Sequence, residues 1–250
     1  MGSGSIVSGQ SVNPARRPDE PRPLRRNQLL SALTDAEFEA LLPDLEKVDL
    51  ATKQTLSEAG EHPAFAYFPE GGILSFTLEL PASGLVEFGI VGRDGISSFS
   101  AIRAGRVSPV RTIVQVGGHG AYRIRSERLR AAIARCPALS LGIQDFLYNF
   151  MGQMALTAVS NARHSLAERL SRWLLMCNDR LDGNEVPLTH EFMAMMLGAQ
   201  RTSVTSSLHI LEGDGAIRSR RGVVRILDRA RLEAIAGEAY YNPVRAIIET

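Results

Sequence analysis

The spacing of Ala194, Gly198 and Val204 restricts the fold of this chain more than any other feature of its sequence. Glycine tolerates the positive φ of a tight turn, so Gly198 is expected to end a first helix. Ala194, four residues earlier, is small enough for a second helix to pass closely. Val204, Leu208 and Leu211 lie at i, i+4 and i+7 and form the buried stripe of that second helix. This order of small residue, turn glycine and buried stripe predicts a helix-turn-helix.

The exposed face of the second helix, about residues 200–212, carries short polar side chains and no carboxylate near its start. A helix that enters the major groove of DNA needs donors near its N-terminus and short polar or methyl-bearing side chains farther along. Arg201, in the first turn, can reach a guanine edge or a phosphate. Thr189 is expected to N-cap the first helix. The candidate DNA-contacting residues of the two helices are Thr189, Gln200, Arg201, Thr202, Thr205, Ser206 and His209.

A basic hairpin follows the second helix in the stretch EGDGAIRSRRGVVRIL. AIRS and VVRIL are typical of two strands joined by a tight turn, which makes a wing over residues 218–225. Residues 218–231 hold six arginines and one acid, Asp228, a local charge of +5 (six minus one) in a chain of net charge +1. Phosphate contacts from such a wing position a protein on DNA and make its affinity salt-dependent. The candidate phosphate contacts are Arg218, Arg220 and Arg221.

The residues before this unit change their pattern twice. From Asn27 to about Lys47 apolar residues recur at helical steps, and Thr34 with Glu37 has the spacing of a capping box. From Val48 to about Arg125 short strand-like runs alternate with turn residues, which favours a β-roll, barrel or sandwich. Helical patterns return at about 126–136, 139–161 and 165–180. The predicted fold class is therefore α+β.

The long helix at about 139–161 is apolar over most of its girth. Its main stripe alternates four- and three-residue steps, the spacing of a coiled-coil seam. The residues of this stripe, which are the candidates for dimerisation, are Ile143, Leu147, Phe150, Met154 and Thr157. We expect one side of the helix to pack on its own domain and another on a second copy, with an ordinary core helix as the alternative.

Residues 166–235, from LAERLSRWLL through PLTHEFMAMMLGAQRTSVTSSLHILEGDGAIRSRRGVVRILDRARLEAIA, resemble the winged helix-turn-helix of the CRP/FNR family of bacterial transcription regulators. The β-rich block and the long helix are similar to that family's cyclic-nucleotide-binding-like β-roll and dimerisation helix. The resemblance implies a β-roll at 27–137, a dimerisation helix at 138–162 and a DNA-binding domain at 163–236. It also implies a homodimer on an inverted-repeat operator in double-stranded DNA, with RNA polymerase as a further candidate partner.

The recognition helix departs from the family's usual pattern at several positions. Members usually carry Arg-Glu near its start and a second Arg one helical turn later. Arg201 keeps the first position, whereas Thr202 stands in place of the Glu and Ser206 in place of the second Arg. Ser207 takes a position that is usually apolar. The resemblance therefore implies a base preference different from that of the best-known members.

The charged residues that would hold a cyclic nucleotide are absent from the β-rich block. Family members that bind one use a Gly-Glu pair for the ribose and, farther along, an Arg-Ser or Arg-Thr pair for the phosphate. Ser97-Ser98 and Ser108-Pro109 stand at these places, and Arg106 and Arg111 are the nearest substitutes. We therefore expect no cofactor and leave the effector unknown, with another ligand or a plain dimer scaffold as the alternatives.

Other site chemistries find little support in the sequence. The two cysteines, Cys136 and Cys177, are too few for the four-cysteine iron–sulfur sensors of the family and lack zinc-finger spacing. Haem ligation through His62, His119 or His164 stays open. No metal-ligand spacing, GxSxG motif, P-loop or arranged Ser/His/Asp set is present, so we expect neither a metal site nor an enzyme.

The sequence indicates a cytoplasmic regulator. No apolar run reaches the roughly 18 residues of a membrane-spanning helix, so no membrane partner is expected. Residues 1–26 lack the apolar stretch of a signal peptide and are rich in Gly, Ser, Pro and Arg, which predicts a disordered leader, and 237–250 is expected to be a tail. The alternative to DNA binding is a ligand-binding regulatory module whose C-terminal unit docks a protein partner. The carboxylate-poor helix face and the basic wing favour DNA.

Overall fold

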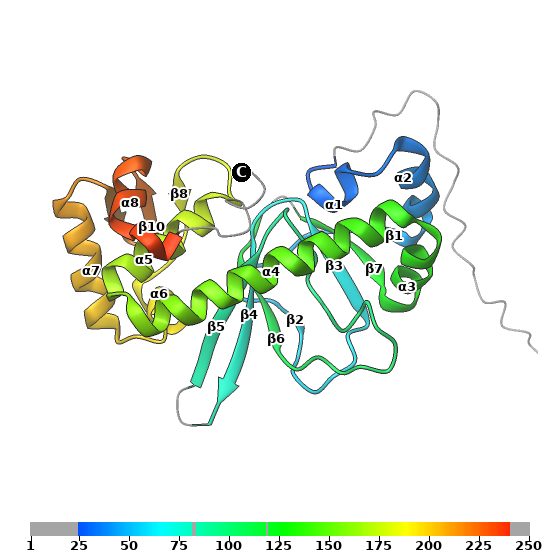
Figure 1. Cartoon of the computed structure of the whole chain (residues 1–250), viewed down its shortest axis with the longest axis horizontal. Helices are drawn as coiled ribbons and strands as arrows, with labels where there is room; N and C mark the ends of the chain where they lie inside the picture. The colour runs from blue at the N-terminus through cyan, green and yellow to red at the C-terminus, as the bar shows by residue number, and fades with distance from the viewer. Residues whose placement is uncertain (1–24, 82–83, 119, 241–250) are drawn as a thin grey trace, which may run out of the picture.

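The computed structural model describes residues 25–81, 84–118 and 120–240 of the 250-residue chain. A β-rich N-terminal part is followed by one long helix, α4, and by a helical C-terminal unit with a small sheet (Figure 1). Helix α4 extends across the molecule and passes both the sheets and the C-terminal helices (Figure 1). The predicted α+β architecture, with a β-sheet domain, a long helix and a winged helix-turn-helix, is confirmed.

The N-terminal part begins with α1 (Gln28–Ser31), α2 (Asp35–Leu41) and the 3-10 turn η1 (Leu42–Asp44). Thr34 and Glu37 each accept a hydrogen bond from the other's backbone N–H, so the predicted capping box is confirmed. The helical region ends before the predicted Lys47. Residues Leu45–Val48 instead form strand β1, because they pair antiparallel with β7 (Ala121–Arg125).

Two antiparallel sheets form the β-roll, with the strand orders β1-β7-β3 and β2-β6-β4-β5. The prediction of short strands interrupted by turns across 48–125 is therefore confirmed. The other strands of the roll are β2 (Thr55–Ser57), β3 (Phe65–Pro69), β4 (Ile73–Leu80), β5 (Gly84–Val91) and β6 (Arg111–Val116).

Three helices lead from the roll into the C-terminal unit. They are α3 (Ser126–Arg135), α4 (Pro137–Arg163) and α5 (Leu166–Asn178). Ser165 and Glu168 form a second capping box, which starts α5 directly after α4 ends. The unit continues through β8 (Glu185–Val186), α6 (His190–Met196), α7 (Arg201–Gly213), β9 (Ile217–Arg220), β10 (Val223–Ile226), α8 (Arg229–Ala236) and the 3-10 turn η2 (Gly237–Tyr240).

Aromatic rings fill the space between the roll and α4. Phe99 stacks on Phe76 with ring centroids 4.8 Å apart, and Phe150 of α4 lies 4.9 Å from Phe99. A Cβ atom on Gly95 would lie 2.1 Å from the ring of Phe146, so glycine at this position allows α4 to approach the roll. Such clusters bury large apolar areas and prefer stacked and tilted pairs. The roll and α4 are thus held together by a packed aromatic core.

Two of the predicted dimerisation residues belong to this core. Ile143 and Phe150 are buried inside the chain itself, which corrects their assignment to a contact with a second copy. Leu147 and Met154 are half-buried against the same cluster, and Thr157 is half-buried as well. Because α4 is apolar on several sides, the four-and-three spacing identifies a buried face but not the partner that buries it.

The boundaries of the predicted leader and tail also change. Arg25 pairs with Asp35 at 2.6 Å and Arg26 with Asp182 at 2.5 Å, so these two arginines belong to the folded part. Turn η2 packs on α5, and the Tyr240 hydroxyl donates to the carboxylate that follows α5 at 2.6 Å. Residues 1–24 and 241–250 lie outside the described residues.

The β-roll and the C-terminal unit share one hydrophobic core. Ile73, Ile90 and Ile113 of the four-stranded sheet lie in the same buried cluster as Trp173 and Leu174 of α5. The fold therefore joins the two parts through packed side chains as well as through α4.

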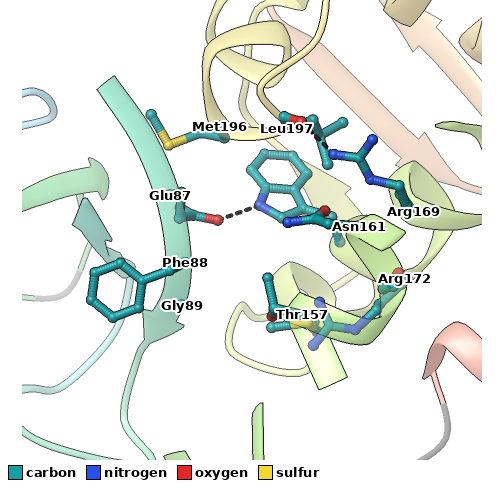
Figure 2. A pocket seen from close by; sticks show the side chains of 12 residues that line it. Glu87, Phe88, Gly89, Thr157, Asn161, Arg169, Arg172, Met196 and Leu197 are labelled. Atoms are coloured by element: carbon teal, nitrogen blue, oxygen red, sulfur yellow. Dashed lines mark hydrogen bonds between the residues drawn. The ribbon is translucent and has the colours of Figure 1, made fainter. Parts of the chain in front are cut away.

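Glu87 of β5 is buried at this junction (Figure 2). Its Oε1 accepts from Trp173 Nε1–H at 2.6 Å, and its Oε2 lies 2.5 Å from Ser75 Oγ. Ser75 Oγ also lies 2.6 Å from Gln115 Oε1. Ser75 has a single hydroxyl proton, so when it donates to Gln115 the carboxyl of Glu87 must supply the proton of the other bond. Burial raises the pKa of Glu87 to about 7, against the hydrogen bonds from Ser75 and Trp173, which lower it.

We predict that Glu87→Gln removes part of the pH dependence of folding stability. The pKa of Glu87 rises from 4.5 to about 7 on folding, so its contribution is complete below pH 4.5 and is lost as the pH rises through 7. The loss is roughly 3 kcal/mol. Glutamine keeps an acceptor for Trp173 and a donor for Ser75. The free energy of unfolding of the variant should therefore change less with pH than that of the wild type. Urea unfolding between pH 5 and pH 8 measures the difference.

The matched control is Glu61→Gln, which changes an exposed carboxylate of the same domain. It should retain the wild-type dependence on pH. The prediction would be contradicted if the free energy of unfolding changed with pH in the same way for the wild type and for Glu87→Gln. That result would show that Glu87 is ionised in the folded protein.

Candidate nucleic-acid interface

The helix-turn-helix consists of α6, the turn at 197–200 and α7 (Figure 1). Thr189 caps α6, its hydroxyl accepting from a first-turn N–H at 3.2 Å. Gly198 has φ +58°, the left-handed conformation that the sequence predicts for the turn. Val204, Leu208 and Leu211 are fully buried against the rest of the unit. The predicted helix-turn-helix is confirmed in each of these details.

One side of α7 is exposed opposite the buried stripe. Arg201, Thr202, Ser206 and His209 are exposed on this side, and Thr205 is half-buried. The guanidinium of Arg201 forms no hydrogen bond or ion pair with any other residue that the structure describes. It is therefore available to a partner molecule.

The start of α7 is also open to a partner. Gln200 is exposed and is the N-cap residue, but its side chain makes no bond to the first-turn N–H groups. Such groups, together with the helix dipole, attract phosphate.

Two hydroxyl groups on α7 bond to the protein itself. Ser206 Oγ donates to the Thr202 carbonyl at 3.1 Å. Thr205 Oγ1 donates to the Arg201 carbonyl at 3.0 Å and also lies 3.1 Å from His190 Nδ1. The hydroxyl of Thr205 is thus committed on two sides, whereas the sequence presents it as a free donor or acceptor.

The acidic residue of α7 is turned toward the wing. Glu212 Oε1 accepts from the Ser219 N–H of β9 at 2.7 Å. This contact uses the carboxylate inside the unit and leaves the exposed side of α7 without one. Ser207, at the position that is usually apolar in the resembled family, is buried beside the stripe.

The predicted wing is the antiparallel hairpin of β9 and β10, in a small sheet of order β8-β10-β9. Arg218 lies directly opposite Arg225, and Arg220 opposite Val223. Because side chains alternate between the faces of a strand, the three arginines share one face, and all are exposed. The other face is formed by Ile217, Ser219, Val224 and Ile226.

This arrangement of arginines is unfavourable without an anion. Like charges directly across a β-hairpin destabilise it. Within the described part of the chain, Arg218, Arg220 and Arg225 form no ion pair. A phosphate between them would relieve the repulsion and make charge-assisted hydrogen bonds.

One arginine of the predicted basic stretch has a structural role instead. Arg229 pairs with Asp179 at 2.7 Å and with Glu233 at 2.8 Å, and its guanidinium also donates to the Tyr240 hydroxyl. These bonds tie α8 to α5 and η2. Arg221 and Arg231, by contrast, are exposed.

His190, the first residue of α6, was not identified from the sequence as part of this site. The ring lies between α7 and the wing, with Nδ1 3.1 Å from Thr205 Oγ1 and Nε2 3.0 Å from Ser219 Oγ. Burial lowers the pKa of His190, and the charges of Arg201 and His209 lower it further. No local pattern could have indicated this contact, because its partners lie 15 and 29 residues away.

The serines at the positions compared with a nucleotide cassette form their hydrogen bonds within the roll. Ser97, Ser98 and Ser108 are buried, and each hydroxyl is bonded to a backbone group of the roll itself. Arg111 pairs with a neighbouring glutamate at 2.6 Å, and Arg106 is exposed.

The groups considered for metal and haem binding are dispersed. His62 is exposed, His164 is half-buried at the end of α4, and His119 lies outside the described residues. Cys136 and Cys177 are unpaired thiols. Within 25–81, 84–118 and 120–240, no group of three or more His, Cys, Asp or Glu side chains could hold a metal ion. In the same residues, no helix has both the length and the apolarity to cross a bilayer.

Comparisons with known proteins agree with this geometry. Residues 168–235 match the family model of the Crp-like helix-turn-helix domain. No curated protein matches the chain by sequence. A CRP family transcriptional regulator from Thermus thermophilus, TTHB099, is 21% identical, with a TM-score of 0.64 over 78% of this chain and 99% of that chain. FixK2 from Bradyrhizobium japonicum is 14% identical, with a TM-score of 0.65 over 77% of this chain and 98% of that chain.

A third solved structure extends the likeness. The c-di-GMP responsive global regulator CLP of Xanthomonas campestris is 16% identical, with a TM-score of 0.61 over 77% of this chain and 99% of that chain. At these identities the structures show that the fold is shared. The match over 168–235 adds the specific kind of helix-turn-helix.

We predict that Gly198→Ala lowers the free energy of unfolding by about 1–2 kcal/mol, because a residue with a Cβ is strained at φ +58°. A Cβ there would meet only Val86 Cγ1, at 3.9 Å, so backbone strain rather than a clash is the cause. Gly198→Asn should cost less, since asparagine tolerates this conformation. Urea unfolding measures both effects.

Gly213→Ala is the matched control, because a Cβ at this helical position meets nothing within 4 Å. It should leave stability unchanged or raise it slightly. Equal losses at the two glycines would show that the turn does not require a positive φ.

Proposed function

We propose that this chain, a DNA-binding transcription regulator of the CRP/FNR family with a Crp-like helix-turn-helix domain, acts as a homodimer on an inverted-repeat operator. In this proposal α7 enters the major groove of each half-site, and the wing contacts phosphates beside it. The activity is sequence-specific binding and not catalysis, as in the family.

The observation that carries the proposal is the joint placement of two surfaces on one small unit. The exposed side of α7 is free of carboxylates because Glu212 bonds to the wing. The wing itself presents Arg218, Arg220 and Arg225 on one exposed face, without ion pairs among the described residues. A polar groove-reading side with adjacent unpaired cations matches the chemistry of a DNA groove and its phosphates.

The residues of this surface take different roles in the proposal. Arg201 is the principal base reader, because its guanidinium is exposed and unbonded at the start of α7. Thr202, Ser206 and His209 line the same side and contribute shorter polar contacts. Phosphate contacts are proposed for Thr189, Gln200, Arg218, Arg220 and Arg221, with Arg225 added by the strand register.

Dimerisation is proposed through a face of α4 that differs from the predicted stripe. Leu141 and Tyr148 are 60% and 55% exposed, and with Ala155 they recur every seven residues. Met151, 56% exposed, and Ala158 lie three residues after Tyr148 and Ala155. This is the heptad spacing of a two-stranded coiled coil, on the side of α4 away from its own aromatic core.

The β-roll is proposed to act mainly as the scaffold of this dimer. Its interior against α4 is occupied by stacked phenylalanine rings, and its cassette positions are bonded internally. The effector stays unassigned.

We predict that Arg201→Ala reduces affinity for a selected operator by about 5- to 150-fold, the equivalent of roughly 1–3 kcal/mol, with little change for random duplex. Arg218→Ala and Arg220→Ala should instead weaken binding to both duplexes alike. Each should reduce the slope of log K against log salt by about 1. Fluorescence anisotropy at several salt concentrations, with an operator selected from a random pool, measures all of these.

Arg103→Ala, an exposed arginine on a loop of the roll, is the matched control and should change neither affinity nor slope. If Arg201→Ala leaves both affinities unchanged, α7 does not read the groove. If the wild-type chain binds no duplex at low salt, the unit docks a protein instead.

We predict that Tyr148→Glu combined with Met151→Glu produces a folded monomer, because four carboxylates would meet in the proposed interface. Affinity for a two-half-site operator should fall by about tenfold or more, since the half-sites are no longer bound together. Sedimentation velocity and circular dichroism measure assembly and folding.

Phe150→Glu distinguishes this face from the predicted stripe. It places a charge in the aromatic core of the chain itself and should unfold the protein. A dimer that survives the double substitution, or a folded monomer produced by Phe150→Glu, would show that the interface lies elsewhere.

A further inference from the structure

His190 connects three elements of the DNA-binding unit. It is the first residue of α6, and its ring lies between the recognition helix α7 and the wing strand β9. Nδ1 is 3.1 Å from Thr205 Oγ1, and Nε2 is 3.0 Å from Ser219 Oγ. Both ring nitrogens are therefore used, one toward the helix and the other toward the wing.

The hydrogen-bond partners of Thr205 decide where the imidazole proton lies. The Arg201 carbonyl, 3.0 Å from Thr205 Oγ1, can only accept, so the single hydroxyl proton of Thr205 goes there. Thr205 Oγ1 must then accept from His190, which requires a proton on Nδ1. A neutral ring protonated on Nδ1 has a lone pair on Nε2, and the Ser219 hydroxyl donates to it.

The surroundings of His190 favour this neutral form. Burial is the main cause that lowers its pKa from 6.5, and the nearby charges of Arg201 and His209 on α7 lower it further. Glu212, also on α7, acts in the opposite direction. From β9 the group that faces the ring is the Ser219 hydroxyl, since Arg218 and Arg220 lie on the other face of the strand. These surroundings therefore favour the uncharged imidazole over the protonated one.

We propose that His190 is a positioning residue of the DNA interface, which fixes the recognition helix to the wing through Thr205 and Ser219. The Thr205 hydroxyl is consumed by this contact and does not read a base. The inference rests on the proposed function and refines it. It removes Thr205 from the residues that the sequence predicts to contact DNA, and it adds a specificity-determining residue that does not touch DNA.

A second bond supports this role. Glu212 accepts from the Ser219 N–H at 2.7 Å, so α7 and β9 are joined at two points along the helix. The two ties fix the distance between Arg201, near one end of α7, and the arginines of the wing. Base contacts and phosphate contacts must be made together, so losing the His190 tie should reduce discrimination more than it reduces general affinity for DNA.

The first test examines the free protein. Nitrogen-15 chemical shifts of the imidazole at pH 7.5 should show His190 as the Nδ1–H tautomer. Thr205→Val should convert it to the Nε2–H tautomer, with the proton then donated to Ser219. His209, exposed on α7, serves as the reference ring and should not change. An Nε2–H tautomer in the wild type, or no change in Thr205→Val, would overturn the assignment.

The second test is a double-mutant cycle on DNA affinity, with His190→Ala, Thr205→Val and the pair. Each single change should weaken binding to a selected operator by about five- to tenfold. The pair should be no worse than either alone within about twofold, because both remove the same contact. Random duplex of equal length should be bound as before. His190→Asn, which keeps a donor near the Nδ1 position, should lose less than His190→Ala.

The outcomes separate the two hypotheses. If the losses multiply in the pair, Thr205 reads a base independently, and the role of His190 is refuted while DNA binding stands. If neither single change affects the operator, His190 is not a positioning residue. If the wild-type chain binds no duplex, the proposed function fails and the role in recognition fails with it, while the tautomer still reports the contact inside the protein.

Discussion

The apolar surface of α4 is the constraint on which the rest of the structure depends. A helix of 27 residues with apolar side chains around most of its girth cannot remain solvated on all sides. The roll buries one side through Phe146 and Phe150, in contact with Phe76 and Phe99. Another side of the helix keeps Leu141, Tyr148, Met151 and Val159 exposed. Burial of one face thus leaves a second face available for assembly.

The same helix leads directly into the DNA-binding unit. Two residues separate the end of α4 from the start of α5, which packs on the roll through Trp173. The indole N–H of Trp173 donates to buried Glu87. Burial raises the pKa of Glu87 to about 7, which favours the neutral carboxyl in this buried site over an uncompensated charge. Because the roll, α4 and α5 share these contacts, the orientation of the helix-turn-helix depends on the core of the N-terminal part.

Within the DNA-binding unit, internal hydrogen bonds decide which polar groups are left for a partner. Glu212 is held by the wing, Thr205 by His190, and Arg229 by acids around α8. Arg201 and the arginines on the exposed face of the hairpin have no such partners among the described residues. The exposed polar surface of this unit therefore depends both on the groups that bond inside it and on the groups that stay exposed.

The sequence by itself determined the features that depend on neighbours a few residues away. The caps at Thr34 and Thr189, the turn at Gly198, the buried stripe of Val204, Leu208 and Leu211, and the basic hairpin were all predictable, because helix and turn signals act over three to eleven residues. Only the tertiary structure decided which face of α4 is buried by its own chain, where Glu87 meets Trp173, and how His190 joins α7 to the wing. These contacts link residues 86, 15 and 29 positions apart, and their geometry follows from how whole elements pack, which no local pattern encodes.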